Sequence, residues 1–268
     1  MTDFTSILLV GCGNMGGAML RGWLASGLSP AKFTIVDPQL EGAPKGVALI
    51  RDYPERTFDA ILLGVKPQML DAVAGDVAPL AGEGTVILSM LAGVELATLE
   101  ERFPNAGAYV RVMPNLAASL GKSPVGMAEI GLDAAQREAV AALMDRLGAA
   151  EWIDEGQFNL VTALAGSGPG FVYRFIDALA SGGAELGLPP ETAQRLALAM
   201  VEGAAALAAQ SPDSPAQLAQ RVASPGGTTE AGLKVLDDGA AMTRLVEKTL
   251  RAARDRGEEL AEAARKQG

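Results

Sequence analysis

Three glycines near the start of the chain carry the clearest chemical signal, because they are spaced G-x-G-x-x-G. Gly11, Gly13 and Gly16 follow the apolar run 7–10 and precede a helical pattern. In this order the first glycine permits a tight turn, the second lets the backbone approach a pyrophosphate, and the third lets helix and strand pack closely. The start of the helix then points free N–H groups at the anion. The pattern predicts a dinucleotide site formed by Gly11, Gly13, Asn14, Met15 and Gly16; a purely structural glycine turn is the alternative.

An acidic residue follows at the spacing that such a site uses for ribose. Asp37 lies about 20 residues beyond Gly16 and ends the second apolar run, residues 33–36. A carboxylate at this place accepts hydrogen bonds from the ribose 2′-hydroxyl and repels a 2′-phosphate. Asp37 therefore favours NADH over NADPH, unless it serves only to start an Asp-Pro turn.

Two further strand ends could face the same ligand. The apolar run 59–65 stops at Lys66, and the run 108–112 is followed closely by Asn115. Ligands of parallel sheets bind at the carboxyl ends of the strands. Lys66 therefore either contacts the cofactor phosphates or ribose, or is solvated. Asn115 either meets the nicotinamide or the substrate, or bonds to its own backbone as a turn residue.

A loop late in the chain has the composition of a carboxylate site. Its sequence is Ser224-Pro225-Gly226-Gly227-Thr228-Thr229, and a helical pattern opens at Glu230. Glycines and threonines before a helix place free N–H groups and hydroxyls together, as in an anion-binding nest. A helix cap would explain one threonine but not the Pro-Gly-Gly that precedes it. We therefore predict that this loop binds a small acidic substrate.

Composition limits both the chemistry and the partners. The 268 residues include no histidine and one cysteine, Cys12, which we interpret as a filler of the glycine turn. Histidine is the commonest general acid–base and metal ligand, so we expect no metal site, and a lone cysteine excludes an internal disulfide. A net charge of −10 without a basic stripe argues against nucleic-acid binding. Without a signal-peptide pattern or a long apolar run, we expect no membrane interaction and a cytoplasmic protein.

The first half of the chain has the pattern of an α/β domain. Apolar runs at 7–10, 33–36, 59–65, 86–90 and 108–112 predict buried strands, with a shorter strand at 47–50 and helices at 18–26 and 134–147. Continuously apolar strands between helices are typical of a parallel sheet covered on both faces. We predict a Rossmann-like dinucleotide-binding domain over residues 1–154.

The second half shows only helical patterns. They predict helices at 159–165, 171–185, 191–210, 215–222, 230–237 and 240–262, with a glycine-rich interruption at 166–170. We predict an all-α domain over residues 155–268. Its small residues let backbones approach closely, which favours a homodimer through this domain over a self-contained bundle. Assembly beyond a dimer stays open.

Taken in order, these motifs resemble the pyrroline-5-carboxylate reductase family over nearly the whole chain. The resemblance is carried by Gly11-Cys12-Gly13-Asn14-Met15-Gly16, Val65-Lys66-Pro67, Ala92-Gly93-Val94, Arg111-Val112-Met113-Pro114-Asn115, Gly166-Ser167-Gly168-Pro169 and the Ser224–Thr229 loop. It implies a Rossmann domain followed by a helical dimerisation domain. It also implies reduction of L-1-pyrroline-5-carboxylate to L-proline by NADH or NADPH, the last step of proline biosynthesis.

The resemblance also implies roles for single residues. Thr229 would be the catalytic residue, with its hydroxyl on the ring nitrogen of the substrate. The substrate-binding residues would be Ser224, Gly226, Gly227, Thr228, Thr229 and Asn115, and the cofactor-binding residues Val65, Lys66, Pro67, Ala92 and Asn115 beside the glycine turn and Asp37. Because a protonated cyclic imine is already a strong electrophile, we expect orientation and electrostatics to matter more than proton chemistry. Arg221, in the segment before this loop, could add charge attraction for the substrate carboxylate.

Two other functions share parts of this pattern. A β-hydroxyacid dehydrogenase also has a Rossmann domain followed by helices, but it should carry a catalytic lysine after its glycine-rich motif. Residues 166–175 hold Arg174 and no lysine, which counts against that function. A non-catalytic nucleotide-binding scaffold is the second alternative, but it would have no need of the Ser224–Thr229 loop.

Overall fold

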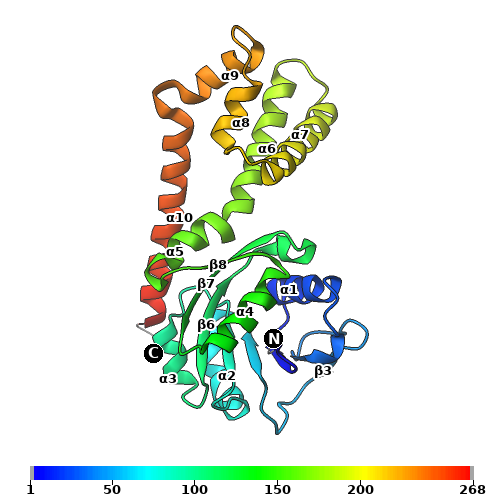
Figure 1. Cartoon of the computed structure of the whole chain (residues 1–268), viewed down its shortest axis with the longest axis vertical. Coiled ribbons are helices and arrows are strands. Elements are labelled where there is room, and N and C mark those ends of the chain that lie inside the picture. Colours follow the sequence, from blue (N-terminus) through cyan, green and yellow to red (C-terminus); the bar gives the residue numbers. More distant parts are fainter. Residues whose placement is uncertain (1–2, 266–268) are drawn as a thin grey trace. The chain divides into compact units, whose positions relative to one another are not determined.

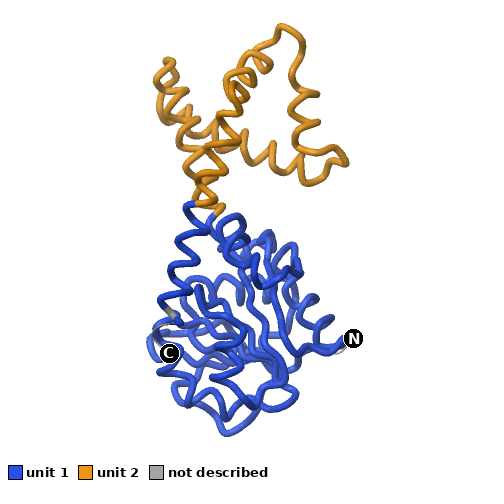
Figure 2. Tube along the Cα trace, turned by 90° about the vertical axis from the view of Figure 1, so that its left-hand side faces the viewer, with its two compact units in different colours: residues 1–167, 252–268 blue, residues 168–251 orange. Residues whose placement is uncertain are grey.

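The structure, a computed structural model, describes residues 3–265. The chain divides into two compact units, drawn in two colours in Figure 2. The first contains the residues up to Ser167 together with those from Ala252 onward, and the second is Gly168–Arg251. The C-terminal helix therefore begins in the second unit and ends in the first. The predicted functional division after residue 154 stays a prediction.

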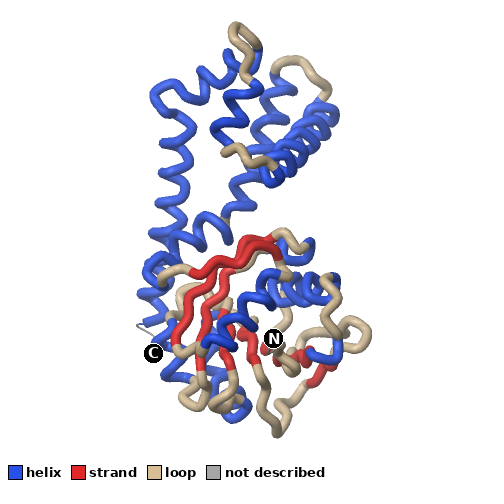
Figure 3. Tube along the Cα trace, viewed as in Figure 1, coloured by secondary structure: helices blue, strands red, loops and turns tan. Residues whose placement is uncertain are grey.

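The first unit is built on one eight-stranded sheet, whose strands are red in Figure 3. In chain order the strands are β1 Ile7–Val10, β2 Phe33–Val36, β3 Ala48–Ile50, β4 Ala60–Leu63, β5 Val86–Ser89, β6 Ala108–Met113, β7 Ser123–Ile130 and β8 Gly148–Trp152. Their order across the sheet is β3-β2-β1-β4-β5-β6-β7-β8. All neighbours are parallel except β6 and β7. The direction of winding reverses between β1 and β4, and open α/β sheets bind ligands at such a point.

Strands β7 and β8 extend the sheet beyond the strands that the sequence predicted. Neither has the apolar run of a doubly buried strand: β7 contains Pro124, Gly126 and Glu129. The short edge strand β8 alternates half-buried and exposed side chains and is rich in alanine. Proline and glycine are uncommon within strands, so local composition gave no strand signal for these segments. The strands depend instead on pairing with β6 and with each other.

Helices cover both faces of the sheet (Figure 1). One face is covered by α1 (Asn14–Ala25) and α4 (Ala134–Asp145). Their side chains Trp23 and Val140 belong to the same buried cluster as Leu9 and Leu62 of the sheet. The opposite face is covered by α2 Leu70–Val77, α3 Leu96–Arg102 and α5 Phe158–Val161. The indole of Trp23 stacks on Phe33 at 5.5 Å and donates to the carbonyl of Leu143. Because both faces are covered, the strands read as continuous apolar runs.

Short helical turns complete the connections. They are η1 Pro30–Lys32, η2 Pro67–Met69, η3 Ala78–Leu80, η4 Leu116–Leu120, η5 Glu155–Gln157, the π-helix η6 Thr162–Gly166 and η7 Asp238–Ala240. From Phe158 to Arg265 the described chain contains helices and no strand. The longer helices are α6 Gly168–Glu185, α7 Pro190–Gln210, α8 Pro215–Val222, α9 Thr228–Asp237 and α10 Ala241–Arg265. The predicted class, a Rossmann-like sheet domain followed by an all-α region, is confirmed.

Several helix boundaries differ from those predicted: α1 begins at Asn14 rather than at residue 18, and α4 ends at Asp145 rather than at residue 147. The expected interruption over 166–170 is wrong in extent, because α6 already begins at Gly168, and Ser167 alone separates it from the π-helix. Helix α9 begins at Thr228 rather than Glu230. Thr228 and Thr229 therefore lie in the first helical turn instead of the loop. Among the described helices, none is long and apolar enough to span a membrane.

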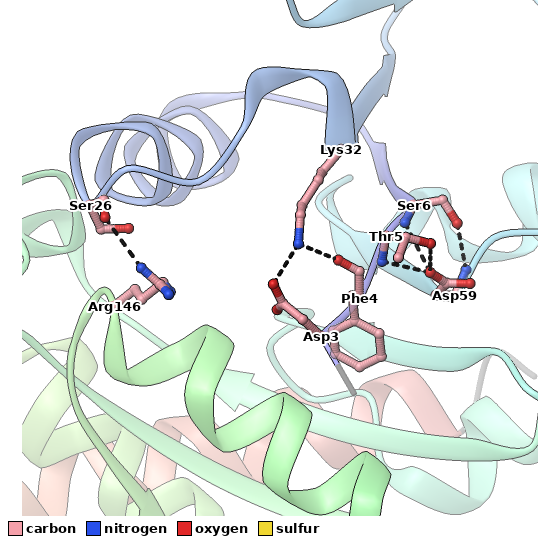
Figure 4. Close-up of polar contacts among 8 residues, drawn as sticks. All are labelled: Asp3, Phe4, Thr5, Ser6, Ser26, Lys32, Asp59 and Arg146. Carbon is pink, nitrogen blue, oxygen red and sulfur yellow. Dashed lines mark hydrogen bonds and ion pairs between the residues drawn. The ribbon is translucent and has the colours of Figure 1, made fainter. Parts of the chain in front are cut away.

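The N-terminal segment is tied to the sheet by one carboxylate. Asp59, just before β4, accepts hydrogen bonds from the backbone N–H and hydroxyl of Thr5, at 2.7 and 2.6 Å, and from the N–H of Ser6, at 3.0 Å (Figure 4). Burial alone would raise the pKa of Asp59, but these hydrogen bonds outweigh it and lower that pKa. The ionised carboxylate therefore stabilises the folded chain.

We expect Asp59→Asn to lower the free energy of unfolding at pH 7 by about 1–2 kcal/mol, because charge-assisted hydrogen bonds are lost. Since the folded pKa lies below the unfolded value of about 3.9, this stabilisation is present above that value and is lost as the pH falls through the folded pKa. Urea unfolding at pH 7 and pH 3 measures the difference. Asp3→Asn, which removes the exposed pair with Lys32, is the control and should cost about 0–1 kcal/mol. An Asp59→Asn deficit as large at pH 3 as at pH 7 would contradict this role.

Candidate active site

The glycine turn between β1 and α1 has the geometry of a phosphate cradle. Gly11 has φ +83°, and a side chain at Gly16 would begin 3.2 Å from the carbonyl oxygen of Gly11. Gly13 is exposed, and nothing lies within 4 Å of the place where its Cβ would be. Among the described residues, the N–H groups of Asn14, Met15 and Gly16 donate to no protein acceptor. The turn therefore offers open space and free donors to an anion, as a dinucleotide requires.

Gly64 supports this cradle, although it lies outside the residues predicted for the site. It follows β4, and its N–H donates to the carbonyl of Val10 at 2.8 Å. A Cβ on Gly64 would lie 2.4 Å from the carbonyl oxygen of Gly11 and 2.8 Å from Cε of Met90. The turn thus rests directly on Gly64. The signal available in the sequence was a glycine at the end of a strand, where close backbone approach is common.

Cys12 fills the turn and is not placed as a nucleophile. The residue is buried, and burial followed by the charge of Asp37 raises the pKa of its thiol. A thiol of raised pKa is protonated at neutral pH and is inert as a nucleophile. Cys12 contributes its backbone N–H instead, which donates to Asp37.

Asp37 lies at the end of β2 and holds the glycine turn. One carboxylate oxygen accepts from the N–H of Cys12 at 2.9 Å, and the other accepts from the N–H of Gln39 at 2.9 Å. A carboxylate has about four acceptor positions, so ribose hydroxyls could still bind it. The exposed Arg51, just after β3, donates to the carbonyls of Asp37 and Leu40. The carboxylate is therefore fixed in position beside the turn.

The remaining cofactor residues predicted after β4 and β5 lie at the same edge of the sheet. Lys66 is exposed, caps η2, and is preceded by the half-buried Val65 and followed by the half-buried Pro67. Ala92 is exposed just beyond β5. Parallel strands end at one edge, so these residues join the glycine turn and Asp37 along the carboxyl ends of the strands. Their contacts with a cofactor stay a prediction.

Asn115 bonds to its own backbone, as one of the two predicted alternatives had it, and also to a carbonyl far away in the sequence. The residue is buried, its Oδ1 accepts from the N–H of Ala117 at 2.9 Å, and its Nδ2 donates to the carbonyl of Ala165 at 2.9 Å. Its N–H donates to the hydroxyl of Ser123 at 2.8 Å. The side chain thus caps η4 and ties the end of β6 to the π-helix. Direct binding of cofactor or substrate by this amide stays a prediction.

The Ser224–Thr229 loop belongs to the second unit. Two of its backbone N–H groups are used in hydrogen bonds within the loop and with the helix that follows. The N–H of Gly226, with φ +72°, donates to Oε2 of Glu230 at 2.7 Å, and the N–H of Gly227 donates to the carbonyl of Ser224 at 2.9 Å. In the described chain, the N–H groups and hydroxyls of Thr228 and Thr229 have no protein partner. Both threonines are exposed in the first turn of α9. A carboxylate ligand would therefore meet the threonines rather than the glycine N–H groups.

Two charged neighbours of this loop have protein partners. Glu230 bonds to Gly226 and also pairs with Lys234 at 3.3 Å, so it holds the loop in shape. Arg221, which the sequence suggested for the substrate carboxylate, is exposed and pairs with Asp213 across α8. Glu230 was missed because nothing in its type distinguishes it from an ordinary acidic residue in the first turn of a helix.

The sheet order and the glycine cradle define a fold of the Rossmann dinucleotide-binding class. Residues 6–93 match the family model described as NADP oxidoreductase, coenzyme F420-dependent, and residues 155–260 match the model for pyrroline-5-carboxylate reductase dimerisation. Pyrroline-5-carboxylate reductase of Pseudomonas aeruginosa is 37% identical, covering 96% of this chain and 97% of that protein. The chain belongs to the pyrroline-5-carboxylate reductase family, as the sequence motifs indicated.

Two further relatives support the same family membership. Pyrroline-5-carboxylate reductase 2 of Bacillus subtilis is 33% identical, with 95% of this chain and 96% of that protein covered. The solved structure of a pyrroline-5-carboxylate reductase from Coxiella burnetii superimposes with a TM-score of 0.89 at 30% identity, covering 96% of this chain and 98% of that one. Similarity over full length means that both the sheet unit and the helical unit have counterparts in these relatives.

Proposed function

We propose that the protein reduces L-1-pyrroline-5-carboxylate to L-proline with NADH or NADPH, the last step of proline biosynthesis. One observation carries the proposal: a chain with a dinucleotide cradle also presents the free N–H groups and hydroxyls of Thr228 and Thr229 at the start of α9. The N–H groups suit the carboxylate of a small cyclic imino acid, and a hydroxyl oxygen can accept a hydrogen bond from its protonated ring nitrogen. Family membership supports the same substrate.

In this proposal, residues of the chain bind the cofactor and the substrate and orient them for the reaction. The open turn at Gly13, the free N–H groups of Asn14 and Met15, and the carboxylate of Asp37 would hold the pyrophosphate and ribose. When bound, the dihydronicotinamide supplies a hydride to the imine carbon. Thr228 and Thr229 bind the carboxylate through backbone N–H groups, and the Thr229 hydroxyl oxygen accepts a hydrogen bond from the protonated ring nitrogen. A protonated imine is already a strong electrophile, so a chain without histidine needs no strong acid.

The same proposal includes a cytoplasmic homodimer formed through the helical region. In the second unit, all of which the structure describes, only Ala193 and Ala197 are buried. Large apolar side chains such as Leu186, Leu207 and Val235 are exposed. Apolar surface on this scale is typical of a surface that another chain covers, and the match to a dimerisation family over residues 155–260 supports a second copy.

We expect purified protein to oxidise NADH in the presence of pyrroline-5-carboxylate, with kcat/KM for NADH at least equal to that for NADPH. The Asp37 carboxylate repels a 2′-phosphate, so Asp37→Asn should raise the NADPH-to-NADH ratio of kcat/KM by about tenfold. Steady-state kinetics with both dinucleotides measures this ratio.

Controls separate the outcomes. Asp76→Asn removes an equal charge from an exposed site on α2 and should leave the ratio unchanged. A β-hydroxyacid tested with the oxidised dinucleotides should give no turnover. Turnover of the hydroxyacid and none of the imine would overturn the proposed function, and a strong NADPH preference would overturn the role of Asp37.

A further inference from the structure

The loop between β5 and α3 carries Ala92, and it packs against the chain's last helix. Ala92 is exposed, whereas the next residue, Gly93, is buried. Gly93 has φ +78°, and its Cβ position lies 3.1 Å from the backbone N of Ala261 and from C and O of Leu260, all in α10. The backbone of α10 therefore occupies the space that any side chain at position 93 would need. Ala261 is itself 3% exposed, so the contact is tight from both sides.

An ion pair reinforces this contact. Arg265, in the last turn of α10, donates to Oε1 of Glu95 at 2.7 Å. Glu95 caps α3 and lies two residues after Gly93. Helix α10 thus contacts the loop at two successive points, by packing at Gly93 and by charge at Glu95.

The far end of the loop has a separate anchor within the sheet unit. The N–H of Leu96, the first residue of α3, donates to Oε1 of Glu155 at 2.8 Å, and the same oxygen accepts from Arg111 of β6 at 2.9 Å. Arg111 is 4% exposed and lies over the Phe158 ring at 3.9 Å. Glu155 and Arg111 fix where α3 starts. Within the segment between β5 and that point, the side chains of Leu91 and Val94 are buried in the core of the sheet unit. The backbone at Gly93 packs against α10.

We propose that the last turns of α10, through Gly93 and the Glu95–Arg265 pair, position the Ala92 loop for the dinucleotide. This inference rests on the proposed function, which assigns Ala92 to the cofactor. Gly93 and Arg265 touch no cofactor in this role; they are positioning residues that act through the loop. A positioning role predicts weaker binding of the dinucleotide without loss of the Thr229 site.

Gly93→Ala tests the packing contact, and Gly27→Ala is its matched control. Both glycines have positive φ, +78° and +91°, so alanine strains both backbones alike, but nothing lies within 4 Å of the Cβ position of Gly27. Displacement of the loop by Gly93→Ala should raise the Kd and KM for NADH by about 10–100-fold. Gly27→Ala should change them by less than about threefold, through strain alone. The KM for the imino acid at saturating NADH should stay within about twofold of wild type in both variants, because the loop shift spares the Thr229 site. Equal effects of the two variants on NADH binding would overturn the inference.

The ion pair gives a second test that does not depend on whether Gly93→Ala folds. Arg265→Glu and Glu95→Arg should each raise the Kd for NADH by about 3–5-fold, and the two together should return it to within about twofold of wild type. Arg256→Glu, which breaks a pair with Glu259 on the same helix, is the control and should leave binding unchanged. Failure of the double variant to restore binding would also overturn the inference.

Titration calorimetry with NADH alone keeps this inference separate from the proposed function. If wild-type protein binds NADH but does not reduce pyrroline-5-carboxylate, the proposed substrate is wrong. The Kd values of Gly93→Ala and Gly27→Ala for NADH still test the positioning role of α10 in that case. If wild-type protein is active and the two glycine variants bind NADH equally, the positioning role of α10 is wrong and the proposed function stands.

Discussion

Thr229→Ala is expected to lower kcat/KM for pyrroline-5-carboxylate by about 10–1000-fold, the range for one oriented hydrogen bond at a reacting centre. Thr229 is exposed in the first turn of α9, and among the described residues its hydroxyl has no protein partner. A hydroxyl that stabilises nothing in the free protein is available to the substrate. Because the helix start is held by the bond between Gly226 and Glu230, the melting temperature should change little.

Three variants make this prediction specific. Thr229→Ser keeps the hydroxyl and should retain most of the activity, whereas Thr228→Ala keeps its backbone N–H and should cost less than Thr229→Ala. Thr249→Ala removes a hydroxyl that bonds to the Leu245 carbonyl within α10, and it should leave kcat/KM unchanged. Steady-state kinetics with saturating NADH measures all four. A fully active Thr229→Ala protein would remove Thr229 from the mechanism.

The sequence predicted those parts of the site that depend on local backbone chemistry. A turn that must approach a phosphate needs glycine, so Gly11, Gly13 and Gly16 could be recognised one by one, and the structure confirms the strand before them and the helix after them. The buried parallel strands could also be recognised, because a strand that is covered on both faces consists of consecutive apolar residues. Both features can be recognised from the types of residues that follow one another along the chain.

Features that depend on distant parts of the chain were not predictable in this way. The sequence indicated that Asn115 either binds a ligand or bonds to its own backbone, but it gave no sign of the bond to Ala165, which lies 50 residues away. The space beside Gly93 is filled by α10, which is distant in sequence, so the motif Ala92-Gly93-Val94 alone does not explain its glycine. Strand β8 has no strand composition and exists because β7 offers a parallel edge. Such contacts become visible only when the fold places the segments together.

Gly64→Ala is expected to weaken NADH binding by about 100-fold, although Gly64 lies outside the glycine motif. Its new Cβ would lie 2.4 Å from the carbonyl oxygen of Gly11, far inside van der Waals contact. The first peptide of the phosphate cradle would have to move, and displacement of a binding element by about 1 Å costs on the order of 100-fold. The φ of Gly64 is not positive, so steric overlap alone predicts the effect. Titration calorimetry measures the Kd.

A double variant tells which neighbour of Gly64 matters. The new Cβ would also lie 2.8 Å from Cε of Met90, the flexible end of a side chain that can turn away. Met90→Ala combined with Gly64→Ala removes this second overlap but leaves the one with the Gly11 backbone, so binding should stay weak. Gly84→Ala, at an exposed glycine with nothing within 4 Å of its Cβ position, should bind NADH as wild type does. If the double variant recovers wild-type binding, the clash lies with the side chain, and the Gly11 turn does not rest on Gly64.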